Sequence, residues 1–134
     1  MAEFILGFTG SRNGLTPAQK DFILAVINEL NPDEVHHGDC VGADALFHQI
    51  VRSIDPKIRI VIHPGNIPKL RAHCKGDEVL PAKDPLERNR DIVDGCDILL
   101  GCPEAKIEVQ RSGTWSTIRY AKRTDCPVRV LGGV

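Results

Sequence analysis

Several features that define common protein classes are missing from this chain of 134 residues. No window approaches the roughly 18 consecutive apolar residues of a membrane-spanning helix. The first residues lack the basic start and the long apolar core of a signal peptide. The five cysteines never show the two-residue spacing of a zinc knuckle, so we expect reduced thiols and no metal site. These absences favour a cytoplasmic protein with no membrane contact.

The net charge and the aromatic content are also low. The formal net charge is −1, from 17 basic and 18 acidic side chains, which gives no overall attraction to nucleic acid. One Trp, one Tyr and four Phe offer few surfaces for stacking bases. Known nucleotide and hydrolase motifs are missing too, since there is no Walker-type phosphate loop, no glycine-rich dinucleotide fingerprint and no Gly-x-Ser-x-Gly elbow. We therefore expect no resident cofactor, and NAD(P) in particular is disfavoured.

What is present is an alternation of short apolar runs and amphipathic segments. Runs at 4–8, 34–37, 58–62, 97–101 and 128–131 read as buried strands. Helix starts follow at Thr16 with Pro17 and Gln19, near Ala43, at Asp84 and at Ser112. This pattern predicts an α/β fold: one Rossmann-like, doubly wound parallel sheet of about five strands with helices on both faces. The length fits a single domain over residues 1–134.

Two segments carry no periodic pattern. Residues 102–111 read as a loop, and so do residues 64–83, which contain three prolines. The longer segment holds five basic or histidine side chains against Asp77 and Glu78. Long loops of this kind are commonly functional or mobile. It reads equally well as a cover for an anion or as a solvated surface loop.

The strongest candidate site stretch is Gly38–Asp44, at the joint between a predicted strand and a predicted helix. Gly38 and Gly42 allow a sharp turn and a close approach to a ligand. Asp39 and Asp44 are able to receive hydroxyl or amine groups, and Asp44 with His48 falls away from the apolar face of the helix. The alternative is that one of these carboxylates only caps the helix.

Two further stretches favour phosphate. Ser112-Gly113-Thr114 places a glycine between hydroxyls at a helix start, where N–H groups and the helix dipole attract anions. Gly10-Ser11-Arg12 follows the first strand and adds a guanidinium fork. Arg88 and Asn89 lie in the first turns of another helix and either brace the site or stay on the surface. His63 lies at a strand end, where its side chain is placed to pack against the base or ribose of a ligand.

Catalysis, if any, falls to carboxylates. Cleavage of an N-glycosidic bond needs an acid for the leaving base and a carboxylate near the cationic sugar. Asp39, Asp44 and Glu87 are the candidates, and no pairing between them is evident from their spacing.

As an ordered set these motifs resemble the SLOG superfamily. The matching segments are Gly10-Ser11-Arg12, Gly38-Asp39-x-x-Gly42-Ala43-Asp44-x-x-x-His48, Glu87-Arg88-Asn89-Arg90-x-Ile92 and Ser112-Gly113-Thr114. The chain looks most like small Rossmann-like members from phages and bacteria, related to YspA and YpsA. It is also similar to the Rossmann domain of the DNA-processing protein DprA. The likeness runs from Phe4 to Val130 and implies binding of a nucleotide or nucleotide-derived ligand.

Some relatives, the LOG-type phosphoribohydrolases, cleave nucleoside monophosphates with a glutamate in the motif Gly-Gly-x-Gly-Thr-x-x-Glu. Aligned on Gly113-Thr114, this chain has Thr117 at that position. DprA-like relatives bind single-stranded DNA, which the charge and aromatic content here do not favour. A homo-oligomer is plausible by resemblance alone.

Three hypotheses follow: nucleotide binding, a nucleoside monophosphate N-glycosidase, and single-stranded DNA binding, in that order. The predicted ligand-binding residues are Gly10, Ser11, Arg12, Gly38, Asp39, Gly42, Ala43, Asp44, His63, Arg88, Asn89, Ser112, Gly113 and Thr114; the catalytic candidates are Asp39, Asp44 and Glu87.

Overall fold

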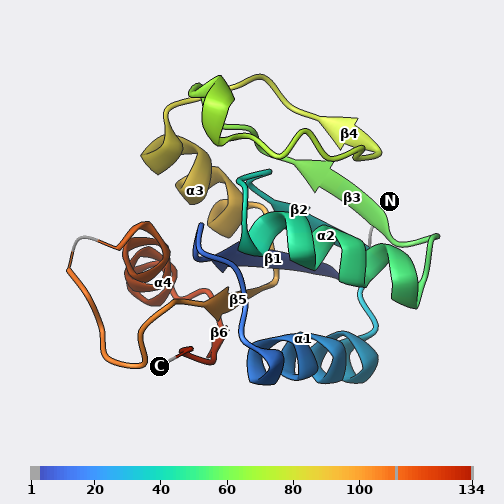
Figure 1. The fold of residues 1–134 in the computed structure, drawn as a ribbon, viewed down its shortest axis with the longest axis horizontal. Helices are drawn as coiled ribbons and strands as arrows, with labels where there is room; N and C mark the ends of the chain where they lie inside the picture. The colour runs from blue at the N-terminus through green and yellow to red at the C-terminus, as the bar shows by residue number, and fades with distance from the viewer. Residues whose placement is uncertain (1–3, 111, 134) are drawn as a thin grey trace.

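A single sheet of six parallel strands organises the chain (Figure 1). A computed structural model describes residues 4–110 and 112–133, so Arg111, at the end of the predicted loop 102–111, lies outside the described residues. The strands follow the order β4-β3-β2-β1-β5-β6. Their bounds are β1 (Ile5–Gly10), β2 (Glu34–His37), β3 (Arg59–Ile62), β4 (Glu78–Val79), β5 (Ile98–Cys102) and β6 (Val128–Val130).

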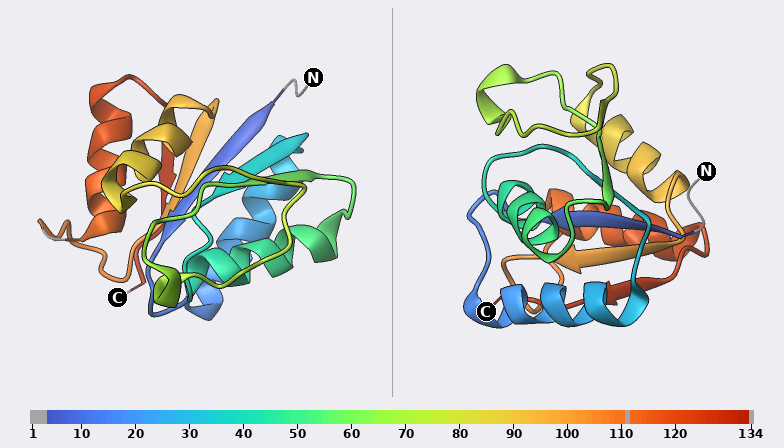
Figure 2. Two further views of the ribbon diagram at one scale, coloured as in Figure 1. Left: turned by 90° about the horizontal axis from the view of Figure 1, so that it is seen from above. Right: turned by 90° about the vertical axis from the view of Figure 1, so that its right-hand side faces the viewer.

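Four helices of the described residues cover the two faces of this sheet. They are α1 (Pro17–Leu30), α2 (Ala43–Ile54), α3 (Pro85–Asp94) and α4 (Gly113–Arg123), with a 3₁₀ turn at Pro68–Leu70. In the left view of Figure 2, α1 and α2 lie on one side of the strands and α3 and α4 on the other. The predicted doubly wound α/β fold is therefore confirmed. Within the described ranges, no helix has the length and apolarity needed to cross a membrane.

Local sequence chemistry accounts for the helix starts. The Thr16 hydroxyl accepts the amide of Gln19 at 3.1 Å, and the Gln19 side chain accepts the amide of Thr16 at 2.9 Å. Pro17 occupies the first helical position, where its missing N–H costs nothing. Asp84 caps α3 by accepting the amide of Leu86, and Ser112 caps α4 by accepting the amide of Trp115. These predicted starts are confirmed.

Burial of apolar side chains on both faces of the strands holds the layers together. Leu6 and Phe8 of β1 face the α1–α2 layer, where Phe8 stacks on Phe47 with ring centroids 4.2 Å apart. A second cluster, under α3 and α4, consists of Ile92, Val93, Leu99, Trp115, Ile118 and Ala121. Apolar burial on both faces explains why the strands read as continuous apolar runs.

The count of about five strands misses β4. Its two residues pair with the end of β3, and neighbouring amides at Asp77 and Leu80 bond the carbonyls of Ile60 and Ile62. Both residues of β4 are exposed at the sheet edge. A two-residue edge strand buries nothing and so leaves no hydrophobic pattern, which is why residues 64–83 read as one continuous loop.

The strand order reverses between β1 and β5. From β1 the chain moves outward through β2, β3 and β4, and then returns to place β5 on the opposite side of β1. In open parallel sheets the loops after the two strands at such a switch point diverge and leave a crevice at their carboxyl ends. The loop after β1 carries Ser11 and Gly14, the loop after β2 carries Gly38 and Gly42, and the loop after β5 leads to Ser112.

Candidate functional site

A cavity of about 850 Å³ opens beyond the carboxyl ends of β1, β2 and β5, at the switch point. Its wall is built from three loops, the segment 67–71 and the first turns of α3 and α4. The lining residues are Phe8, Thr9, Gly10, Ser11, Arg12, Asn13, Gly38, Cys40, Val41, Asp44, Ile67, Leu70, Arg71, Pro85, Leu86, Arg88, Asn89, Ile92, Glu104, Val109, Ser112, Gly113 and Thr114.

The loops after β1 and β2 touch through two glycines. Gly42 precedes α2 with φ 92° and ψ −124°, and a Cβ there would lie 2.2 Å from the carbonyl oxygen of Arg12. A Cβ on Gly10 would lie 2.5 Å from the Cβ of Ala43. The amide of Ala43 donates to the carbonyl of Ser11 at 2.9 Å. Glycine at these positions lets two backbones approach closely, so Gly42 and Ala43 shape the site without lining it.

Arg88 joins three parts of the wall from within. Its Nη1 donates to the carbonyls of Gly38 at 2.6 Å and His63 at 3.2 Å, and its Nε donates to Pro85 at 3.3 Å. Nη2 donates to the Cys40 Sγ at 3.4 Å. The side chain is only 6% exposed. A Cβ on Gly38 would lie 2.4 Å from Nη1, so only glycine leaves room for this guanidinium.

The electrostatics of the cavity favour an anion. Arg12, Arg71 and Arg88 line it, against the carboxylates Asp44 and Glu104. Arg71 forms an ion pair with the buried Asp39, with 2.9 Å between Arg71 Nη2 and Asp39 Oδ2. Across residues 4–110 and 112–133, neither Arg12 nor Arg88 forms an ion pair with a carboxylate. Their positive charges remain available to a ligand.

The N-terminus of α4 opens on this cavity. The Ser112 hydroxyl caps the helix by accepting the amide of Trp115 at 3.2 Å. Gly113 is exposed, and a Cβ on it would meet nothing within 4 Å. Thr114 is buried and also lines the cavity. Helix N–H groups, an open glycine and a hydroxyl thus face the same space as Arg12.

Asp44 is the one predicted catalytic carboxylate that lines the cavity. It lies in the first turn of α2, is 6% exposed, and accepts the amide of Cys40 at 3.1 Å. Burial raises the pKa of Asp44 to about 6, although the Cys40 amide and Arg88 oppose the shift. The capping alternative is wrong for this residue, because the N-cap of α2 is Gly42 and makes no side-chain cap bond.

Replacing Asp44 by Asn is expected to stabilise the fold at pH 8 by about 2 kcal/mol. The native pKa lies above the usual value of 3.8, so the ionised carboxylate costs the native state free energy above pH 6 and nothing below about pH 4. The gain should therefore shrink as the pH falls from 8 to 4, measured by urea unfolding across that range. A variant less stable than wild type at pH 8 would contradict the assigned burial cost.

Ten of the predicted site residues line the cavity: Gly10, Ser11, Arg12, Gly38, Asp44, Arg88, Asn89, Ser112, Gly113 and Thr114. Five do not: Asp39, Gly42, Ala43, His63 and Glu87. Glu87 lies exposed on α3. His63 faces a different, smaller cavity on the other side of Arg88.

Asp39 is turned away from the cavity and does not reach a ligand there. Its backbone takes the left-handed conformation, with φ 56°, and its side chain is fully buried. One carboxylate oxygen accepts Arg71 Nε at 3.0 Å, and the other accepts the amide of Cys74 at 2.9 Å. Asp39 therefore anchors the segment after Pro68–Leu70 and delivers Arg71 to the cavity wall. Arg71 is the basic residue of loop 64–83 that lines this cavity.

His37, His48 and Cys74 offer three metal-binding atoms within 4.8 Å of one another. His37 Nδ1 accepts the amide of Asp39 at 2.9 Å, and burial lowers the pKa of His37 to about 3. The neutral ring therefore carries its proton on Nε2 and donates it to His48 Nδ1 at 2.9 Å. A metal ion bound at His37 Nε2 would require a lone pair on that nitrogen, which carries the proton instead. The lone pair of His37 Nδ1 is already occupied by the amide of Asp39. We assign these histidines to packing between β2 and α2.

Sequence reasoning missed the apolar part of the cavity. Val41, Ile67, Leu70, Leu86 and Val109 line it, from four different segments. Val41, Ile67, Leu86 and Val109 are also exposed large apolar side chains. Nothing in their spacing signals this gathering, because the segments meet only in the folded chain. The cavity thus combines a cationic wall with an apolar rim.

The fold can be compared with that of known proteins. No protein-family model and no curated protein sequence matches the chain. A molybdenum cofactor binding protein from the phototrophic bacterium Rippkaea orientalis is similar in structure, with a TM-score of 0.70 and 20% identity, over 98% of this chain and 78% of that one. TM1055, a structural genomics target, is similar with a TM-score of 0.63 and 16% identity, over 93% and 72% of the two chains. At these identities the likeness shows a common fold.

Proposed function

We propose that the protein binds a nucleotide or nucleotide-derived ligand in the cavity at the switch point. The observation that carries this proposal is convergence: the loops after β1, β2 and β5 and the start of α4 line one cavity of about 850 Å³. That volume falls within the range of small-molecule sites, about 300–1,000 Å³. Of the three arginines in its wall, Arg12 and Arg88 form no ion pair with a carboxylate of the described residues, 4–110 and 112–133.

The phosphate is assigned to the start of α4. There the open Gly113, the Thr114 hydroxyl and the first helical N–H groups combine with the positive end of the helix dipole. Arg12 lines the same cavity from the loop after β1 and offers a fork that fits two phosphate oxygens. The guanidinium of Arg12 beside this helix start favours phosphate over a neutral group.

The rest of the ligand is assigned to the apolar rim and Asp44. A planar base buries apolar surface against side chains such as Leu70 and Leu86, and Asp44 accepts a hydroxyl or amine hydrogen. Similarity to the SLOG superfamily in the ordered motifs supports this assignment, as does the shared fold with a molybdenum cofactor binding protein. The latter makes a cofactor of that kind an alternative ligand.

A thermal-shift screen against nucleoside mono-, di- and triphosphates tests the proposal. A ligand that binds only the native state raises the melting temperature by mass action. We expect a concentration-dependent rise with at least one nucleotide, larger than any rise with the matching free base, and none with ribose. If no nucleotide shifts the melting temperature at millimolar concentration, the proposal is wrong.

Gly113→Asp is expected to reduce nucleotide affinity by about 100-fold or more while leaving the fold intact. Space around Gly113 is open, and a carboxylate suits a helix start, so the substitution is sterically and electrostatically tolerated by α4. The new charge occupies the assigned phosphate position. Isothermal titration with the best nucleotide of the screen measures the loss.

Gly113→Ala serves as the matched control, because it adds a methyl group in the same place without charge. We expect its affinity to stay within about threefold of wild type. Equal nucleotide affinity in Gly113→Asp and Gly113→Ala would contradict the assignment of the phosphate to the start of α4.

A second candidate function is N-glycosidic cleavage of a nucleoside monophosphate. One observation favours it: Asp44 lines the cavity with a pKa of about 6, so a fraction is protonated near neutral pH and able to assist a leaving base. Thr117, in place of the LOG-type glutamate, is buried and bonds the carbonyl of Gly113 at 2.8 Å. Chromatography of a nucleoside monophosphate incubated with the protein tests this function. If wild type releases free base and Asp44→Asn does not, the protein is an enzyme.

Single-stranded DNA binding has less support. Phe8, Phe47 and Trp115 are buried, and Phe4, Phe22 and Tyr120 are half-buried, so the chain offers little exposed aromatic surface for stacking bases. Salt-dependent retention of an oligonucleotide on the immobilised protein would favour this alternative. A homo-oligomer and a cytoplasmic location stay predictions.

A further inference from the structure

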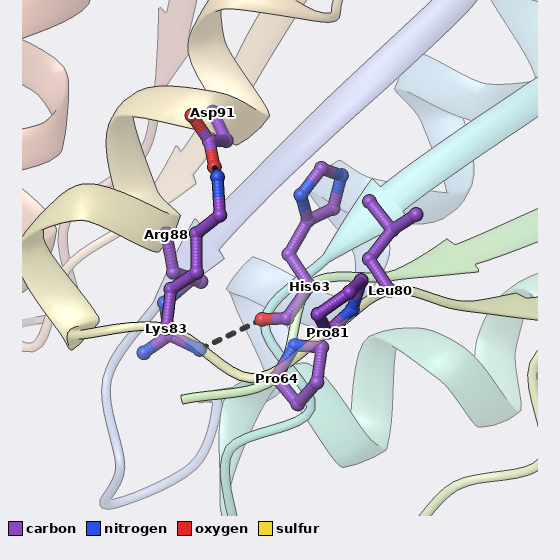
Figure 3. A pocket seen from close by; sticks show the side chains of 7 residues that line it. All are labelled: His63, Pro64, Leu80, Pro81, Lys83, Arg88 and Asp91. Carbon is purple, nitrogen blue, oxygen red and sulfur yellow. Dashed lines mark hydrogen bonds and ion pairs between the residues drawn. The ribbon is translucent and has the colours of Figure 1, made fainter. Parts of the chain in front are cut away.

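A second cavity, of about 280 Å³, lies between the end of β3, the segment after β4 and the start of α3 (Figure 3). Its lining is His63, Pro64, Leu80, Pro81, Lys83, Arg88 and Asp91. Pro64, Leu80 and Pro81 make the walls apolar, and Lys83 pairs with Asp91 at 2.7 Å on one side. Figure 3 shows the imidazole of His63 standing between that ion pair and Leu80.

His63 is the end of a hydrogen-bonded series that starts at a carboxylate. Glu34 Oε2 lies 2.7 Å from His36 Nε2, and His36 Nδ1 lies 2.7 Å from His63 Nε2. All three side chains come from neighbouring strands, since β2 supplies Glu34 and His36 and His63 directly follows β3. Both rings are buried, with 8% and 7% exposure for His36 and His63. A carboxylate that orients a histidine, which orients the next group, is a recurring arrangement in sites that move protons.

The carboxylate fixes the tautomers when both rings are neutral. A carboxylate accepts only, so His36 Nε2 carries the proton toward Glu34 and His36 Nδ1 presents a lone pair. His63 Nε2 then donates to that lone pair, which leaves the lone pair of His63 on Nδ1. In the described ranges, 4–110 and 112–133, His63 Nδ1 has no hydrogen-bond partner.

The surroundings keep His63 neutral. Burial and the neighbouring His36 lower the pKa of His63 to about 4, and Arg88 and Lys83 act in the same direction. Asp91 acts in the opposite direction and is itself held by Lys83. The His63 ring is thus largely buried, and its Nδ1 is an acceptor without a protein partner that is open to a largely apolar cavity.

We propose that this cavity is a second binding site, which takes a small planar heterocycle of nucleobase size through a ring N–H donated to His63 Nδ1. The walls of Pro64, Leu80 and Pro81 exclude water around that bond, and Lys83 and Asp91 meet polar groups on the rim of the ring. A volume of 280 Å³ suits a single small ring system rather than a whole nucleotide. The site is separate from the switch-point cavity and does not depend on the function proposed for it.

Two substitutions at His63 separate binding from packing. His63→Gln puts an N–H near the Nε2 position and keeps the bond to His36, but has no acceptor at the Nδ1 position. His63→Asn keeps an acceptor near Nδ1 and loses the bond to His36. If His63 serves only the structure, the Gln variant should behave more like wild type. If His63 accepts a hydrogen bond from a ligand, the Asn variant should keep more of the ligand affinity.

Nuclear magnetic resonance of ¹⁵N-histidine-labelled protein with adenine and uracil as probes is the experiment. We expect His63 Nδ1 to show the shift of an unprotonated nitrogen, and that shift to move with at least one probe at millimolar concentration. Affinity should fall about tenfold or more in His63→Gln and stay within about threefold in His63→Asn.

Leu80→Trp provides an independent variant that fills the cavity and leaves the three-residue series unchanged. It should abolish binding of the probe while the histidine resonances keep their shifts. Three results would each overturn the proposal: a proton on Nδ1 in the free protein, no response to either probe, or wild-type affinity in Leu80→Trp and His63→Gln.

Discussion

Replacing Gly42 by Ala is expected to lower the free energy of unfolding by about 3 kcal/mol or more. Gly42 has φ 92° and ψ −124°, a conformation that L-residues rarely adopt. A Cβ there would lie 2.2 Å from the Arg12 carbonyl oxygen, a backbone atom that moves only if the loop after β1 moves. Steric overlap and backbone strain therefore add. The midpoint of urea unfolding measures the loss.

Gly113→Ala is again the control, because Gly113 begins α4 with open space around it. Replacing glycine by alanine within a helix stabilises by up to about 1 kcal/mol, so this variant should be neutral or slightly more stable. If Gly42→Ala costs less than about 1 kcal/mol, the loops after β1 and β2 tolerate separation. The close approach would then not be what shapes the cavity.

Helix starts and most strand positions were predictable because their determinants are local. The bonds between Thr16 and Gln19 span three residues, and Pro17 acts through its own ring. Apolar runs such as Ile98–Cys102 reveal strands because both faces of the sheet are covered. β4 carried no such signal, since its two exposed residues are ordered by backbone bonds to β3.

The candidate site was predictable only in part, because side-chain direction depends on distant partners. Asp39 and Asp44 look alike in the sequence, five residues apart after the same strand. The left-handed backbone of Asp39 and its partner Arg71, 32 residues away, turn that carboxylate out of the cavity. Asp44 stays on the wall because α2 begins directly before it. The convergence of glycine-bearing loops followed from parallel topology, whereas the fate of each carboxylate did not.

Arg88→Met is expected to destabilise the protein by about 3 kcal/mol. The sequence offered little reason to separate Arg88 from Arg90, two residues further along α3. In the structure Arg88 is buried and bonds the carbonyls of Gly38 and His63, which belong to the ends of different strands. Methionine fills similar space but leaves both carbonyls without their donor, at about 1–3 kcal/mol each. Removal of a buried charge offsets part of that cost.

Arg90→Met on the same helix is the matched control, since Arg90 is exposed and rests over the ring of Tyr120 at 5.3 Å. Its effect on unfolding should stay within about 0.5 kcal/mol. Because Arg88 lines both cavities, Arg88→Met should also weaken ligand binding in each, which Arg90→Met should not do. An unchanged unfolding free energy with lost nucleotide affinity would show that water from the cavities satisfies the two carbonyls. Arg88 would then act on the ligand directly, rather than by holding Gly38 and His63 together.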